Sequence, residues 1–319
     1  MSDTAPSGMT NAPSSPKKLV PTGDDCRKYF RTHIAKEELG QFHKDDAIDG
    51  FVPIAETMVK ALFKLGCGKE VALQLSLLIL YDMVMLIDDS SSMVSEQGGQ
   101  RIETLKETME EITTVYQLAN KDGIKAVEFI NATAGLRGVG KEDWKKCFED
   151  IKYDGVTPIG TSLKRKILDK FVWNAPMTKP LVVIIITDGE AEGEPHWMLE
   201  GVISDCVRKI TEDSTRGARA VLFQFARVGD DKAAEKLLQK LDDSDVFGKN
   251  VDCLGGVDLE TISHMDHRWM MVAKLLLGST IATWDDLVGD TGGGLPQVAH
   301  ADSDSDGSDD DDGDDKGKA

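Results

Sequence analysis

The stretch that decides the fold is Tyr81–Met93, YDMVMLIDDSSSM, a short apolar run followed at once by acidic and hydroxyl side chains. An apolar run of this length, without polar residues at alternate positions, is typical of a strand that is buried on both faces. The same pattern recurs over 181–187, LVVIIIT, and over 220–226, AVLFQFA. These three runs predict the central strands of a parallel sheet.

Helical segments separate the predicted strands. Apolar residues recur at three- and four-residue spacing over 101–118, 161–172, 198–210, 232–241 and 269–277. We also predict a strand over 127–130 and a short helix over 143–151. Strands that alternate with amphipathic helices are typical of an α/β domain, with a doubly wound, mostly parallel sheet covered by helices on both faces. We assign residues 81–285 to this domain.

The rest of the chain divides into three parts. Residues 1–22 are rich in Pro, Ser and Thr, so we expect a disordered N-terminus. Residues 23–80 form a helical N-terminal segment, with a break at Gly66-Cys67-Gly68. We expect residues 286–319 to form a flexible acidic tail, in which nine Asp lie between residues 302 and 315 and are offset by Lys316 and Lys318. The sequence does not say whether the N-terminal helices bury against the α/β domain or offer a second contact surface.

The composition excludes several classes of function. The net charge of the 319 residues is −19, which argues against nucleic acid and anionic membranes as partners, because both are bound through cationic patches. The five cysteines are odd in number and form no C-x-x-C, which indicates a reduced protein. The first residues contain no apolar core of a secretory signal, and no apolar run is long enough for a membrane span. We therefore expect a cytoplasmic protein.

Polar residues follow two of the predicted strands and occupy one loop. Asp88, Ser90 and Ser92 follow the first strand, Asp188 follows the strand at 181–187, and Thr157 lies in a Gly-rich loop that enters the next helix. Ligands of open α/β sheets bind at the carboxyl ends of the strands, so these side chains could converge there. All are hard oxygen donors, which suit Mg²⁺, or alternatively Mn²⁺ or Ca²⁺, and do not suit zinc or copper.

These residues carry a resemblance to a known family. The Asp-x-Ser-x-Ser pattern, the Thr and the Asp-Gly resemble, in order and spacing, the metal-ion-dependent adhesion site of von Willebrand factor A-type (vWFA) domains. YDMVMLIDDSSSM, DGVTPIGTSL and FQFARVGDD resemble the intracellular, fungal-type members. The resemblance covers about residues 80–285 and implies a Rossmann-like fold. Ser91 is a departure, because the family usually has Gly there, but it removes no ligand.

The resemblance also implies a role for each residue of the site. Ser90 and Ser92 would coordinate the ion directly, as would Thr157 in the ligand-competent state, while Asp88 and Asp188 would act directly or through water. The implied function is non-enzymatic: a partner protein supplies an acidic residue that completes the coordination of the ion. The identity of the partner and the oligomeric state are not predicted.

Two alternatives remain open. One is a metal-dependent phosphohydrolase or nucleotide-binding protein, although no Lys or Arg lies in the three loops to stabilise a developing anion. The other is a scaffold with a vestigial metal site, in which Asp188→Ala would change stability only slightly. The segment 135–141, GLRGVGK, has phosphate-loop spacing, but Glu142 stands where that motif needs Ser or Thr, so we interpret it as a Gly-rich connecting loop.

Two acidic segments have similarly open interpretations. Glu190, Glu192 and Glu194 form either a solvated loop or an acidic rim around the metal site. Residues 302–307 match the first half of an EF-hand loop, but position twelve is Gly313, so we expect a solvated acidic tract.

Overall fold

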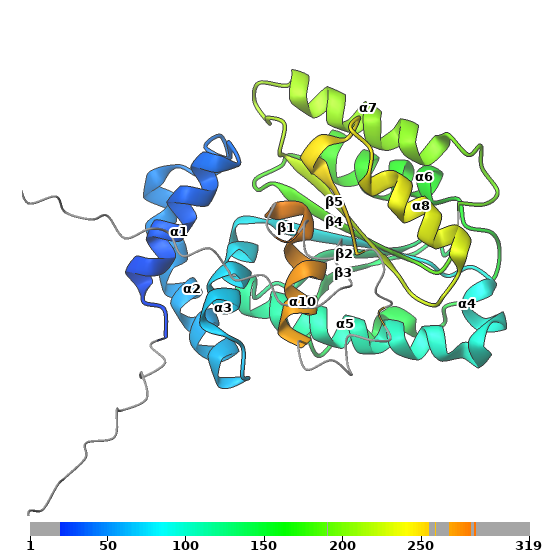
Figure 1. Ribbon diagram of the computed structural model, residues 1–319, viewed down its shortest axis with the longest axis horizontal. Coiled ribbons are helices and arrows are strands. Elements are labelled where there is room, and N and C mark those ends of the chain that lie inside the picture. Colours follow the sequence, from blue (N-terminus) through cyan, green and yellow to red (C-terminus); the bar gives the residue numbers. More distant parts are fainter. Residues whose placement is uncertain (1–19, 190, 255–258, 260–267, 282–283, 285–319) are drawn as a thin grey trace, which may run out of the picture. The chain divides into compact units, whose positions relative to one another are not determined.

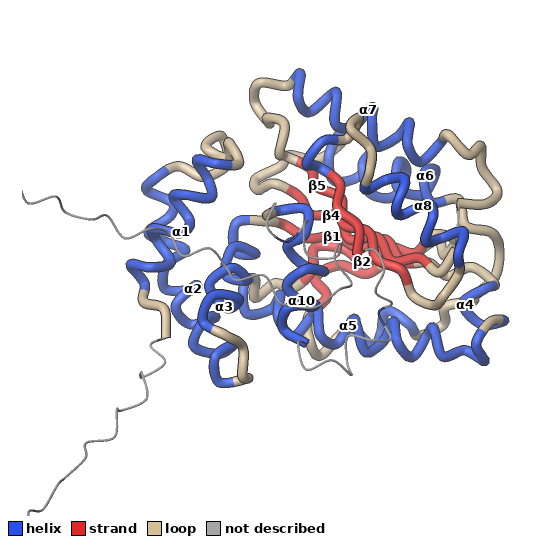
Figure 2. The backbone as a smooth tube through the Cα atoms, viewed as in Figure 1, coloured by secondary structure: helices blue, strands red, loops and turns tan. Residues whose placement is uncertain are grey.

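The protein is described by a computed structural model that covers residues 20–189, 191–254, 259, 268–281 and 284. These residues form a six-stranded sheet with the order β3-β2-β1-β4-β5-β6. All neighbouring strands are parallel except β2 and β3. Helices cover both faces of the sheet (Figures 1 and 2). The predicted fold class, a doubly wound, mostly parallel α/β sheet, is confirmed.

The central strands form where the apolar runs predicted them. The strands are β1 (Asp82–Ile87), β2 (Ile124–Phe129), β3 (Leu136–Val139), β4 (Leu181–Thr187), β5 (Val221–Arg227) and β6 (Val251–Leu254). Every residue of β4 and β5 is buried, as expected for strands enclosed between two helical layers. β2 begins three residues before the predicted strand, and the edge strands β3 and β6 were not predicted.

The interpretation of residues 135–141 as a connecting loop is wrong. Most of this segment is β3, which pairs antiparallel with β2 and forms one edge of the sheet. The backbone N–H of Lys141 donates to Oε1 of Gln117 at 2.6 Å. A phosphate loop wraps the N-terminus of a helix, whereas this segment is extended, so its resemblance to that motif is a coincidence of spacing.

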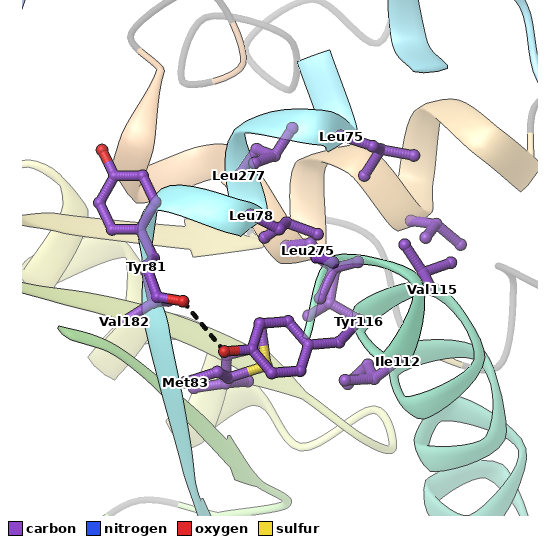
Figure 3. Packing of buried hydrophobic residues seen from close by; sticks show 14 of the residues in the cluster. Leu75, Leu78, Tyr81, Met83, Ile112, Val115, Tyr116, Val182, Leu275 and Leu277 are labelled. Carbon is purple, nitrogen blue, oxygen red and sulfur yellow. Dashed lines mark hydrogen bonds between the residues drawn. The ribbon is translucent and has the colours of Figure 1, made fainter. Parts of the chain in front are cut away.

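Two later helices cover one face of the sheet, and the N-terminal helices pack beside them at the end of the sheet (Figure 1). They are α1 (Gly23–Lys36), α2 (Asp45–Lys64), α3 (Lys69–Leu75), the 3-10 helix η1 (Ser76–Leu80), α5 (Gln100–Ala119) and α10 (Arg268–Leu277). Their apolar side chains form one buried cluster with Met83, Met85 and Ile87 of β1. Figure 3 shows this packing around Tyr81, whose carbonyl accepts a hydrogen bond of 3.0 Å from Tyr116. The N-terminal helices therefore bury against the α/β domain, chiefly through α5 and α10.

The opposite face carries a second cluster. It is covered by α6 (Ile159–Ser162), which continues into the π-helical segment η4 (Leu163–Trp173), by α7 (Met198–Glu212) and by α8 (Lys232–Asp242). Val84 and Leu86 of β1 point into this cluster, because successive side chains of a strand alternate between the two faces. The short elements α4 (Ser92–Ser95), η2 (Gln97–Gly99), η3 (Trp144–Phe148), η5 (Gly248–Asn250) and η6 (Gly278–Thr280) lie in the connections.

Several predictions fall on other parts of the chain. The predicted disordered N-terminus lies outside the described residues except for 20–22, and the predicted acidic tail lies wholly outside them. All five cysteines are buried and free of disulfide bonds. Within the described ranges, no helix combines the length and the apolar character that crossing a membrane requires.

Candidate metal site

The predicted site residues lie where the order of the strands changes direction. β1 and β4 are hydrogen-bonded neighbours whose connections leave on opposite sides of the sheet. Ile87 pairs in register with Ile186, and the N–H of Asp88 donates to the carbonyl of Ile186 at 2.9 Å. Asp88 and Asp188 thus emerge side by side at the carboxyl ends of two adjacent strands, the usual location of ligand sites in such sheets.

Four of the five predicted ligands are joined in one chain of hydrogen bonds. The N–H of Ser90 donates to Oδ1 of Asp88 at 2.9 Å, and the hydroxyl of Thr187 donates to Oδ2 of Asp88 at 2.6 Å. The hydroxyls of Ser90 and Ser92 lie 2.9 Å apart. Ser92 in turn donates to Oδ1 of Asp188 at 2.9 Å. The structure therefore brings together the two motifs, which are about 100 residues apart in the sequence.

A buried arginine, which the sequence analysis missed, completes this chain. Nη1 of Arg101, near the start of α5, lies 2.8 Å from Oδ2 of Asp188. Its Nη2 lies 2.6 Å from Glu96 and 3.7 Å from Asp230. Arg101 lies outside the three motif loops, and no local pattern distinguishes it from other charged residues of an amphipathic helix. Only the tertiary structure places it at the site.

The two aspartates lie in a strongly desolvated environment. Both are fully buried, and Ser90 is 2% exposed. Burial, together with the charge of Asp188, raises the pKa of Asp88 to about 6. Burial also raises the pKa of Asp188, although the hydrogen bonds from Arg101 and Ser92 act in the opposite direction. Two carboxylates that resist ionisation next to each other are a favourable environment for a cation.

Three loops carry the site: the first follows β1, the second contains Thr157, and the third follows β4. Ser91 joins the first loop to the second. Its N–H donates to the carbonyl of Gly155 at 3.2 Å, and its hydroxyl accepts from the N–H of Gly155 at 3.1 Å. Gly155 has φ of +100°, a backbone conformation that favours glycine. Ser91, the residue that departs from the vWFA pattern, thus holds the loop carrying Thr157 against the loop carrying Ser90 by two hydrogen bonds.

Asp89, between the motif residues, also has a structural role that the sequence analysis missed. Its carboxylate is buried and accepts from the N–H groups of Asn131 and Ala132 at 2.7 and 2.8 Å. The side-chain amide of Asn131 donates onward to the carbonyl of Val156 at 3.0 Å. This arrangement links the end of β2 to the first and second loops, and the pattern Asp-x-Ser-x-Ser contains no signal for it.

Thr157 lies in a loop that is held against the loop carrying Ser90, through the contacts of Gly155 and Val156. It is 4% exposed, and its carbonyl accepts from the N–H of Glu192 at 3.1 Å. Within the described part of the chain, its hydroxyl is not a member of the hydrogen-bonded chain that joins the other four residues. Backbone contacts of its loop therefore hold Thr157 near the edge of the sheet, and a role of its hydroxyl as a ligand stays a prediction.

Glu194 fits neither of the two interpretations of the acidic segment. Its carboxylate accepts from the N–H groups of Gly160 and Thr161, at 2.8 Å each. Neither N–H can bond within the helix, because both lie in the first turn of α6. The helix dipole also stabilises a carboxylate at this position. Glu194 thus secures the third loop to the second, and Glu190 lies outside the described residues.

The chemistry of the donor set fits a hard divalent cation. The site offers two carboxylates and three hydroxyls, all oxygen donors of the kind that Mg²⁺, Mn²⁺ and Ca²⁺ prefer. The guanidinium of Arg101 already places a positive charge against Asp188. Across the described ranges, no group of three or more His, Cys, Asp and Glu side chains is arranged to hold a metal ion.

Comparisons with known proteins give limited similarity. No family model matches the chain, and neither does any curated protein sequence. The solved structures that are similar to it include a von Willebrand factor type A protein from Catenulispora acidiphila, with a TM-score of 0.40 and 20% identity over 61% of this chain and 42% of that chain. Another is proximal thread matrix protein 1 from the mussel byssus, with a TM-score of 0.41 and 20% identity over 61% of this chain and 47% of that chain. The similar region spans less than half of each of those proteins.

Proposed function

We propose that this chain is a non-enzymatic protein-interaction module of the vWFA type, which binds its partner through a divalent cation, in the first place Mg²⁺. The observation that carries the proposal is the hydrogen-bonded chain from Asp88 through Ser90 and Ser92 to Asp188, at the carboxyl ends of β1 and β4. The sequence pattern alone predicts the same four residues as metal ligands.

Each residue of the cluster has a role in this proposal. Ser90, Ser92 and Thr157 supply neutral hydroxyl ligands, and Asp88 and Asp188 supply negative charge directly or through water. Because only two of the five donors are charged, a bound ion would keep the ability to attract a carboxylate from a partner. The three loops hold the donors in place through the contacts of Ser91, Asp89 and Glu194 described above.

The surface around the site also favours a protein partner. Val94, Val156 and Trp197 are 48, 47 and 58% exposed, and one of them stands on each of the three loops. A Cβ at Gly193 would lie 2.3 Å from a methyl group of Val156, so the loop after β4 closely approaches the loop that carries Thr157. Apolar side chains around a polar centre are typical of protein interfaces, in which aromatic anchors surround a specific polar contact.

The proposal includes a cytoplasmic location, which the reduced cysteines favour. It includes neither nucleic acid nor a membrane as a partner, because the net charge is −19. No observation on the described residues favours the phosphohydrolase or nucleotide-binding alternative. The segment with phosphate-loop spacing is an edge strand, and the cation nearest the site, Arg101, is engaged by three carboxylates.

The proposal is tested by calorimetric titration of the full chain with Mg²⁺ and Mn²⁺. We expect Ser92→Ala and Thr157→Ala to weaken ion binding at least tenfold, because each removes a ligand. Ser95→Ala is the matched control: it removes an exposed hydroxyl from the same short helix, α4, and should leave the affinity unchanged. A parallel pull-down should retain a partner in Mg²⁺ and lose it in EDTA or with Thr157→Ala. Absence of ion binding by the wild type, or equal affinity in all variants, would refute the proposal.

A further inference from the structure

The buried cation beside the candidate site is not explained by its own helix. Arg101 is 1% exposed and lies in the first turn of α5, where the helix dipole disfavours a positive charge. Burial of a guanidinium is itself costly unless carboxylates compensate for it. Neither the helix dipole nor burial favours a cation at this position. The groups that face Arg101 must therefore explain why it is there.

The surroundings of Arg101 are built to hold it. Asp188 and Glu96 lie 2.8 and 2.6 Å from its guanidinium, and Asp230 lies 3.7 Å away. A Cβ at Gly229, which has φ of +81°, would lie 2.4 Å from Nε of Arg101. The loop after β5 can approach the guanidinium only because it carries glycine there. Loop, helix and strand ends thus fix this cation on Asp188.

The position of Arg101 has a direct electrostatic consequence for the site. Asp88 and Asp188 together present two buried negative charges, and Arg101 offsets one of them. Glu96 and Asp230 are 51 and 76% exposed, so solvent screens their charges. A divalent cation bound to the two aspartates alone would give a neutral centre, whereas with Arg101 present the loaded centre would carry one net positive charge.

We propose that Arg101 is a built-in counter-charge that tunes this site: it weakens the binding of the divalent cation and strengthens the attraction of the loaded site for an anionic group of the partner. The inference rests on the proposed function and adds a residue outside the vWFA motif to it. Arg101 acts through Asp188 and is a positioning residue.

The test compares the Mn²⁺ affinity of four forms of the full chain by calorimetry at low ionic strength. Arg101→Met removes the counter-charge and should bind Mn²⁺ at least tenfold more tightly than the wild type, a difference of about 1.4 kcal/mol. Arg101→Lys keeps the charge and should stay within about threefold of the wild type. Lys106→Met is the matched control, because it removes a partly exposed cation from the same helix, where Lys106 pairs with Glu103 at 2.7 Å.

The second half of the inference is tested with acetate as the carboxylate probe. Acetate should raise the apparent Mn²⁺ affinity of the wild type and of Arg101→Lys by a larger factor than that of Arg101→Met, with chloride of equal ionic strength as the reference. Complexation of free Mn²⁺ by acetate is the same for all variants and cancels in this comparison. An equal or larger factor for Arg101→Met would overturn this half of the inference.

The outcomes separate the inference from the proposed function. Wild-type binding with unchanged or weaker binding by Arg101→Met overturns the inference and leaves the function standing. Binding by Arg101→Met alone supports the inference and refutes ion-dependent recognition by the wild type. Binding by neither refutes both. If Arg101→Met is unfolded without metal, circular dichroism follows its folding instead. If Arg101→Met folds at Mn²⁺ concentrations below the wild-type dissociation constant, the inference is supported. If it does not fold at ten times that concentration, the inference is overturned.

Discussion

Removal of Asp188 should destabilise the fold even when no metal is present. Asp188→Ala deletes the only fully buried carboxylate among the three that engage Arg101, and leaves a guanidinium that is 1% exposed. The interpretation of a vestigial site predicted only a slight loss of stability for this variant. Because Asp188 forms a buried ion pair with Arg101, we expect a large loss of stability instead.

The magnitude follows from the ion pair of Asp188 with Arg101 and from its repulsion of Asp88. Breaking a buried ion pair by removal of one partner costs about 3–5 kcal/mol. Arg101 keeps Glu96 at 2.6 Å, which favours the lower end of this range. Asp188 also helps to raise the pKa of Asp88 to about 6, so its removal relieves a repulsion and offsets about 1 kcal/mol. We therefore expect Asp188→Ala to lower the free energy of unfolding by about 2–4 kcal/mol.

The assay is urea unfolding of the full chain in EDTA, with the free energy taken from the midpoint and slope. Asp230→Ala is the matched control, because it removes a carboxylate 3.7 Å from the same guanidinium at a position that is 76% exposed, and should cost well under 1 kcal/mol. The double variant Asp188→Ala/Arg101→Met should be more stable than Asp188→Ala alone, since the unpaired cation is gone. A cost below 1 kcal/mol for Asp188→Ala, or simple additivity in the double variant, would refute the reasoning. A loss of partner binding by Asp188→Ala is consequently no evidence for a metal, whereas Ser92→Ala and Thr157→Ala are informative.

Two further predictions concern packing and pH. Gly160→Ala should lower the free energy of unfolding by about 1–3 kcal/mol, because its Cβ would lie 2.6 Å from the backbone N of Leu199. Gly50→Ala in α2, where a Cβ would meet nothing within 4 Å, should raise the free energy of unfolding by about 0.5–1 kcal/mol. Equal effects of Gly160→Ala and Gly50→Ala in urea unfolding would contradict the close packing at Gly160. Burial lowers the pKa of His33 to about 3, so the unfolded chain, with a histidine pKa near 6.5, takes up the proton first as the pH falls. The free energy of unfolding should therefore decrease below pH 6.5 by up to about 1.4 kcal/mol per pH unit. His33→Gln should lessen this slope between pH 6.5 and 4.5, and His196→Gln, at an exposed position, is the control. An unchanged slope in His33→Gln would argue against a buried neutral His33.

The centre of the sheet was predictable from the sequence because its strands are buried on both faces. β1, β4 and β5 therefore appear as mostly apolar runs without a regular alternation of polar residues. The edge strands lack this signal. β3 is four residues long and contains Gly138 with φ of +60°. β6 contains Asp252, which is 1% exposed and pairs with Lys274 of α10, so its polar residue is compensated by a helix that comes later in the chain.

The same distinction applies to the site. Asp88, Ser90, Ser92, Thr157 and Asp188 could be nominated because each follows a strand or enters a helix at a known edge of the sheet, and whether they hold an ion stays a prediction. Arg101, Asn131 and Glu194 act through contacts that only the folded chain creates.

These unpredicted residues decide what the predicted ones can do. Hydroxyl donors on three separate loops would serve as ligands only if the loops are held together, because ordering each loop on binding would cost conformational entropy. Ser91 joins the first loop to the second, and Glu194 joins the second to the third. Arg101 then sets the charge of the assembled cluster from outside all three. A motif search on the donors alone would therefore assign the same site to a chain that lacked these contacts, although such a chain would have neither the preformed geometry nor the counter-charge.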